Sequence, residues 1–139
     1  AALEQIVPYV DVVFPSHPEE TGALVGLDSE LDVIGHFLDR GVGTVALKCG
    51  EGGAWIGPAE GIARVAAVAP QGVSDTTGAG DAFAAGVLHG MVRGWGPFEG
   101  ARGGVASAGL KVARRGAIVS QPSLEEVEKV VGSVELAWQ

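Results

Sequence analysis

The residues that could carry out chemistry are concentrated in one short stretch, Val73–Phe83, which reads VSDTTGAGDAF. Gly78 and Gly80 let the backbone approach a ligand closely and adopt torsion angles that larger residues resist. An apolar helix is expected to begin here, and the first N–H groups of a helix favour an anion such as a phosphate. Asp81 follows directly, where its carboxylate could accept the proton of an attacking hydroxyl group. The stretch therefore predicts phosphoryl transfer.

The short string GAGD also has a simpler interpretation. Two glycines can form a tight turn, and Asp81 can cap the helix, because aspartate is common at helix starts. The longer string DTTGAGDAF, followed by Ala84, Ala85 and Gly86, is more specific. It resembles the C-terminal signature of the ribokinase-like (PfkB) carbohydrate kinase family. The resemblance extends from Asp11 to Pro122 and covers only the C-terminal portion of the family.

This resemblance implies an ATP-dependent phosphotransferase that acts on a hydroxyl of a sugar, a sugar acid or a nucleoside. Asp81 would be the general base, and the backbone N–H groups of Gly78, Ala79 and Gly80 would form the anion hole. Mg²⁺ would bridge the phosphates of the nucleotide. The N-terminal substrate and lid portion of the family is expected to be absent from this chain.

Further nucleotide contacts are implied by the same resemblance. Lys48 and Gly50, followed by Gly53, resemble the strand and turn beside the nucleotide phosphates, at the carboxyl end of a strand where ligands of open α/β sheets bind. A lysine whose stem covers a sheet edge is the alternative. Val105 stands about where relatives often carry an asparagine beside the adenine, so looser recognition of the base is expected.

Two metal sites are also implied. Glu19 matches the acidic position that orients the metal–phosphate complex, often through water, as Mg²⁺ prefers. Ser16 stands where the family carries an asparagine, which weakens that match, and Glu19 could equally be an acidic residue in the first turn of a helix. The second site is a possible K⁺ site, made by Asp75 and Thr77 and completed near the loop that contains Gly116 and Ser120. A local turn bond from Asp75 to Thr77 is the alternative there.

Composition limits the classes of function. A chain of 139 residues with 47% hydrophobic and 19% charged residues can form one folded domain. The net charge of −8 argues against nucleic acid as a partner. No apolar run approaches the roughly 18–20 residues that span a bilayer, so no membrane partner is expected. The single cysteine, Cys49, cannot form an internal disulfide, which favours a cytoplasmic location, and its apolar strand predicts a packing role.

The alternation of strands and helices predicts the α/β class, with a three-layer, mainly parallel sheet flanked by helices. We expect residues 1–139 to form a single nucleotide-binding and catalytic domain portion. Strands are expected near residues 9–14, 44–49, 54–56 and 64–68. Helices are expected near residues 19–24, 28–38, 81–93, 98–112 and 123–131, the last one with a capping box formed by Ser123 and Glu126.

A second hypothesis is a non-catalytic nucleotide-binding or assembly fragment that lacks its substrate-binding half. In that case the chain would self-associate or bind an N-terminal partner segment. A dinucleotide-binding module of the Rossmann type is disfavoured, because no G-x-G-x-x-G string follows the first strand. Under either remaining hypothesis, the chain alone is expected to bind nucleotide weakly and to phosphorylate nothing.

Overall fold

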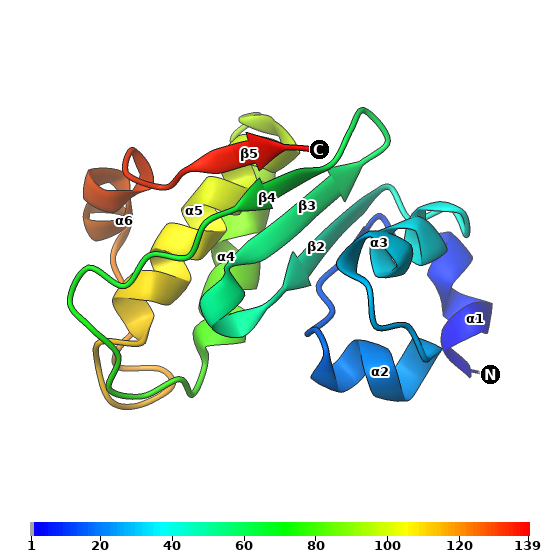
Figure 1. Ribbon diagram of the computed structural model, residues 1–139. Helices are drawn as coiled ribbons and strands as arrows, with labels where there is room; N and C mark the ends of the chain where they lie inside the picture. Colours follow the sequence, from blue (N-terminus) through cyan, green and yellow to red (C-terminus); the bar gives the residue numbers. More distant parts are fainter. Residues whose placement is uncertain (1) are drawn as a thin grey trace. The chain divides into compact units, whose positions relative to one another are not determined.

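The computed structural model describes residues 2–139 (Figure 1). The chain divides into two compact units. Unit 1 contains the residues up to Arg64 together with Trp138 and Gln139, and unit 2 contains Val65–Ala137. None of the helices within residues 2–139 is both long and apolar enough to cross a membrane.

Unit 1 combines short helices with a small sheet. Its elements are α1 (Ala2–Ile6), a 3₁₀ turn (Val7–Tyr9), β1 (Val12–Val13), α2 (Glu19–Val25), α3 (Glu30–Leu38), β2 (Thr44–Lys48), a second 3₁₀ turn (Gly50–Gly52) and β3 (Ala54–Pro58). Helix α3 begins after Ser29, whose hydroxyl accepts a hydrogen bond from the N–H of Asp32 at 3.4 Å. Serine is among the residues preferred at a helix N-cap, because its oxygen satisfies an N–H of the first turn.

The core of unit 1 lies between α3 and β2. Val33, Ile34 and Phe37 form the buried face of α3, and they belong to the same apolar cluster as Val45 and Leu47 of β2. The two strand residues are fully buried, which explains the apolar run from Val45 to Leu47 in β2. This packing fixes the end of β2, where Lys48 stands.

The sheet of unit 1 is mixed, whereas a mainly parallel sheet is expected from the sequence. β1 and β2 are parallel, with Val12 opposite Thr44. β2 and β3 are antiparallel, with Lys48 opposite Ala54. Only residues 49–53 join β2 to β3, and a parallel pair needs a crossover of about a dozen residues or more. Gly50 and Gly53, with φ of 52° and 87°, allow this tight reversal.

Unit 2 is dominated by two helices that lie side by side, α4 (Ala79–Val92) and α5 (Gly96–Lys111), shown in green and yellow in Figure 1. Glycines bring their backbones together. A Cβ atom on Gly104 would lie 2.7 Å from the carbonyl oxygen of Phe83, and one on Gly86 would lie 2.7 Å from that of Gly103. Larger residues at these positions would separate the two helices.

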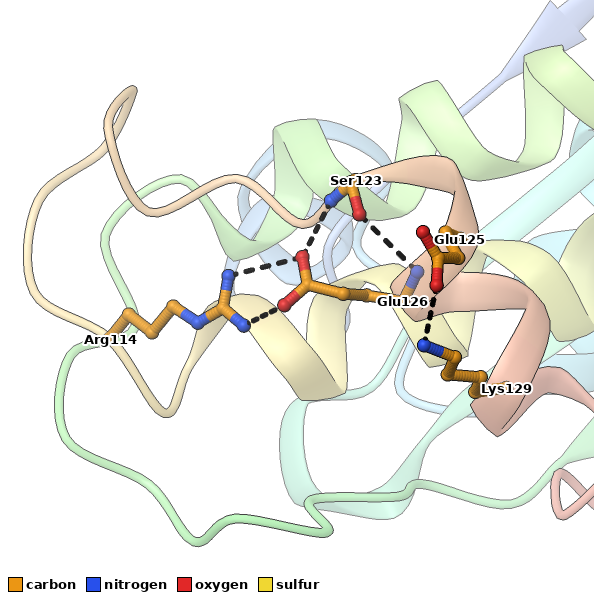
Figure 2. A network of polar contacts seen from close by, with 5 residues as sticks. All are labelled: Arg114, Ser123, Glu125, Glu126 and Lys129. Carbon is orange, nitrogen blue, oxygen red and sulfur yellow. Dashed lines mark hydrogen bonds and ion pairs between the residues drawn. The ribbon is translucent and has the colours of Figure 1, made fainter.

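A third helix of unit 2, α6 (Leu124–Val131), packs against α5. The predicted capping box is confirmed: Ser123 Oγ accepts the N–H of Glu126 at 3.3 Å, and the Ser123 N–H donates to Glu126 Oε2 at 2.8 Å. Figure 2 shows this cap together with an ion pair between Lys129 and Glu125 along the helix, at 2.7 Å. The cap fixes the end of the loop that precedes α6.

The remaining strands, β4 (Ala63–Val65) and β5 (Leu136–Trp138), are neighbours in the sheet. Each contains a position at which the sequence changes from one unit to the other. β5 is not expected from the sequence. Gly57 and Pro58 are expected to end β3, but both belong to it, because Val45 and Thr44 of β2 pair with them. The expected first strand is shorter, since Val7–Tyr9 forms a 3₁₀ turn.

Candidate active site

The site begins at Gly78, the residue that caps the N-terminus of α4. Gly78 has φ of 80° and ψ of 6°, a left-handed conformation that favours glycine. A Cβ atom at this position would lie 3.1 Å from the carbonyl oxygen of Ala117 and 3.3 Å from its Cα. Both the backbone angle and the close approach of the loop at Ala117 therefore require glycine here.

The N–H groups at this helix end differ in their availability. The N–H of Ala79 donates to the carbonyl oxygen of Thr76 at 3.0 Å. Within residues 2–139, the N–H groups of Gly78 and Gly80 have no hydrogen-bond acceptor. Two of the three donors predicted for the anion hole are thus free to bind a ligand, and α4, with 14 residues, adds its dipole.

Asp81 is exposed in the first turn of α4. It lines a cavity of about 400 Å³. The other lining residues come from α4, α5 and the loop before α6: Ala82, Ala85, Ser107, Ala117, Ile118, Gln121 and Pro122. A carboxylate that is accessible, next to free N–H donors and on the wall of a cavity can accept a proton from a bound hydroxyl group.

Gln121 is a member of the site that the sequence does not reveal. Its Nε2 donates to the carbonyl oxygen of Ala117 at 2.7 Å and lies 3.5 Å from that of Gly78. This side chain therefore holds the loop before α6 beside the glycine turn. No local pattern marks such a role, because Gln121 and Gly78 are 43 positions apart.

Asp75 lies at the start of the same loop, and its carboxylate accepts two backbone hydrogen bonds. Its Oδ1 accepts the N–H of Thr77 at 3.0 Å, and its Oδ2 accepts the N–H of Gly116 at 2.9 Å. These two backbone hydrogen bonds lower the pKa of Asp75 from 3.8 to about 2. The local turn bond to Thr77 and the approach of the Gly116 loop are thus both present, and Asp75 joins the two loops.

We expect the Asp75→Asn variant to be less sensitive to acid than the wild type. Because the folded state lowers the pKa of this carboxyl group, its contribution to stability is complete above about pH 4 and disappears as the pH falls towards 2. The free energy of unfolding, measured by urea denaturation from pH 6 to pH 2, should fall less steeply in the variant below pH 4. Equal slopes would contradict the role of these hydrogen bonds.

The expected K⁺ site does not fit the donors that the structure provides. The ammonium group of Lys111 donates to the carbonyl oxygens of Asp75, at 2.9 Å, and of Arg114, at 3.0 Å. The hydroxyl group of Ser120 donates to the carbonyl oxygen of Gly116. The carbonyl oxygens of Asp75, Arg114 and Gly116 are therefore already bonded to donors of the protein, and one of these donors is a cation.

A second group of predicted residues lies in unit 1. The N–H of Lys48 donates to the carbonyl oxygen of Pro15 at 2.9 Å, and its own carbonyl accepts the N–H of His17 at 2.8 Å. The end of β2 and the segment that precedes α2 are thus side by side. Ser16 donates its N–H to Glu20 Oε2 at 2.7 Å.

The remaining predicted residues of this group and of α5 lie as follows. Glu19 is the exposed first residue of α2. Gly50 and Gly53 shape the turn after β2. Val105 is buried in α5, with 5% of its surface exposed, and the wall of the cavity beside Asp81 includes Ser107 instead.

Two observations bear on metals and nucleophiles. Within residues 2–139, no group of three or more His, Cys, Asp or Glu side chains is placed to hold a metal ion. A divalent ion would therefore have to be held largely by nucleotide phosphates and water, with single carboxylates such as Glu19 or Asp81. Burial raises the pKa of Cys49 to about 11, which agrees with a packing role for its thiol.

Comparisons with known proteins identify the family of the chain. Residues 1–124 match the pfkB family carbohydrate kinase. The chain is 30% identical over 128 residues to an ATP-dependent 6-phosphofructokinase of Thermoanaerobacterium thermosaccharolyticum, covering 92% of this chain and 39% of that protein. It is 30% identical over 139 residues to a 2-dehydro-3-deoxygluconokinase of Bacillus subtilis, covering 99% of this chain and 42% of that protein.

Solved structures confirm the fold class. The ribokinase of Arabidopsis thaliana, solved with ribose and ATP, superimposes with a TM-score of 0.84 at 28% identity, covering 92% of this chain and 43% of that one. The α/β fold of the ribokinase type is thereby confirmed, with the mixed sheet described above. The chain spans about two fifths of the length of the curated relatives it matches. Fold, signature and sequence agree that the chain belongs to the pfkB family of carbohydrate kinases.

Proposed function

We propose that this chain is the nucleotide-binding and catalytic portion of an ATP-dependent kinase that phosphorylates a hydroxyl group of a sugar, a sugar acid or a nucleoside. One observation carries the proposal: Asp81 lines a cavity beside the free N–H groups of Gly78 and Gly80. The relatives named above are kinases of sugar phosphates, sugar acids and sugars, which supports this class of acceptor.

In the proposed reaction Asp81 accepts the proton of the acceptor hydroxyl as its oxygen attacks the γ-phosphorus of ATP. Charge on the transferring phosphoryl group is stabilised by the N–H donors of Gly78 and Gly80 and by the dipole of α4. Mg²⁺ supplies additional charge neutralisation when it is bound to the nucleotide. Lys48, Gly50 and Gly53 remain candidates for nucleotide contacts, Val105 for contact with the base, and Glu19 for water-mediated contact with Mg²⁺.

A non-catalytic nucleotide-binding or assembly role remains the alternative. The chain spans 39% and 42% of the length of two curated kinases. Under this alternative the site would still bind a nucleotide, but acceptor phosphorylation would need a further segment, either as an N-terminal partner or through self-association. A cytoplasmic location stays a prediction based on the single cysteine.

The anion site can be tested on the chain itself by nucleotide titration. In buffer with EDTA and without Mg²⁺, we expect Asp81→Asn to bind ADP about two- to fivefold more tightly than the wild type, because a carboxylate close to the phosphates repels them. Glu135→Gln is the matched control, since it removes one exposed negative charge of unit 2 and should leave Kd unchanged. Equal Kd values for Asp81→Asn and the wild type would contradict an anion site beside Asp81.

A further inference from the structure

Lys111 is the largest fully buried side chain of the described residues, and the proposed reaction does not use it. It is the last residue of α5, and none of its surface is exposed. A buried ammonium group is unfavourable unless it is bonded and its charge is compensated. Its ammonium group donates to the carbonyl oxygens of Asp75 and Arg114, at 2.9 and 3.0 Å, and its charge interacts with the carboxylate of Asp75.

The two acceptors belong to the two loops that form the site. Asp75 opens the loop that leads through the glycine turn to Asp81, and Arg114 lies in the turn that follows α5. The carboxylate of Asp75 also bonds the N–H groups of Thr77 and Gly116. The ammonium group of Lys111 and the carboxylate of Asp75 thus hold the two loops against each other.

Arg114 is fixed from its other side as well. Its guanidinium group forms an ion pair with Glu126, the residue that completes the capping box of α6 (Figure 2). The carbonyl oxygen of Arg114 is therefore presented to Lys111 by a segment that is itself anchored. The protein thus holds the two carbonyl oxygens in place for the ammonium group, as it would for a bound monovalent cation.

We propose that Lys111 acts as a tethered monovalent cation that holds the loop of residues 75–80 in shape, so that no free potassium ion is needed there. K⁺ and an ammonium group carry the same charge, and both are bound by carbonyl oxygens. The covalent link places the charge permanently and without the entropy loss of capturing an ion from solution. Lys111 is a positioning residue in this proposal, and its role does not depend on phosphoryl transfer.

The proposal predicts that removing the side chain creates a dependence on ions. We expect the wild-type chain to have the same thermal midpoint in KCl, NH₄Cl and choline chloride at equal ionic strength. Lys111→Ala should unfold at a lower temperature in choline chloride, and K⁺ or NH₄⁺ should restore part of the loss. At a concentration about tenfold above the dissociation constant, the gain should be about 3–6 °C.

Two further variants make this test specific. Lys111→Met fills the space without a charge, so it should be less stable than the wild type and should not respond to K⁺. Lys129→Ala removes an exposed lysine with 69% of its side-chain surface accessible, and it should behave like the wild type in all three salts.

Three results would overturn the proposal, and the first two can be obtained even if Lys111→Ala does not fold. One is stabilisation of the wild type by K⁺ relative to choline. Another is a Lys111→Met variant as stable as the wild type. The third is a folded Lys111→Ala variant that does not distinguish K⁺ and NH₄⁺ from choline. Because the measurement is stability, a failure here is distinct from a failure of the proposed kinase activity.

Discussion

Replacing Asp81 by asparagine should reduce kcat by about 10²- to 10⁴-fold, the usual effect of removing a general base, when the chain is assayed together with an N-terminal substrate portion of the kind that the family carries. The amide has almost the same shape as the carboxylate but cannot accept the proton of the acceptor hydroxyl. It leaves the glycine turn intact, because Gly78 is held by its own backbone angle and by its contact with Ala117. Steady-state kinetics with a saturating acceptor measure the effect.

Nucleotide binding separates a chemical role of Asp81 from a structural one. The variant should bind the nucleotide more tightly than the wild type, because the charge that repels the phosphates is gone, while kcat falls. Glu135→Gln, which removes another exposed carboxylate of unit 2, should keep the wild-type kcat. Near-normal turnover by Asp81→Asn would show that another group takes the proton.

The second large effect is expected for Gly109→Ala. A Cβ atom on Gly109 would lie 2.0 Å from the carbonyl oxygen of Val68 and 2.9 Å from its carbonyl carbon. Both neighbours are backbone atoms, so α5 or the segment before the glycine loop must move. We expect the free energy of unfolding to fall by about 3 kcal/mol, at the upper end for overpacked sites. Urea denaturation measures this loss.

Gly22→Ala is the matched control for this substitution. Gly22 lies within α2, and no atom lies within 4 Å of the position that its Cβ would take. Alanine is the better helix former by about 1 kcal/mol, so this variant should be as stable as the wild type or more stable. If Gly109→Ala unfolded at the same urea concentration as Gly22→Ala, α5 would not approach Val68 so closely.

The parts of the molecule that depend on local signals could be predicted from the sequence. The start of α4 follows from GAGD, and the start of α6 follows from the spacing of Ser123 and Glu126, because caps and left-handed turns are formed by neighbours in the chain. The apolar strand at Thr44 was predictable for a similar reason, since full burial leaves a continuous apolar run.

The parts that depend on distant contacts could not be predicted in this way. Lys111 is an ordinary residue for the end of a helix, and only its bond to Asp75, 36 positions away, reveals its role. Gln121 is likewise defined by its place beside Gly78. β5 is a short strand whose pairing depends on β4, far earlier in the chain, so its own three residues carry little signal.

The most direct test of the central claim is ADP release by the chain together with an N-terminal substrate portion of the kind that the family carries, measured with and without a panel of acceptors. The panel should contain fructose 6-phosphate, 2-dehydro-3-deoxygluconate, ribose and several nucleosides, the first three being named by the relatives. We predict that at least one acceptor raises ADP release to an ordinary kinase rate, on the order of 1–100 s⁻¹, and that Asp81→Asn abolishes this increase. ADP release that no acceptor increases, or an increase that Asp81→Asn retains in full, would contradict the assignment of this chain to acceptor phosphorylation by Asp81.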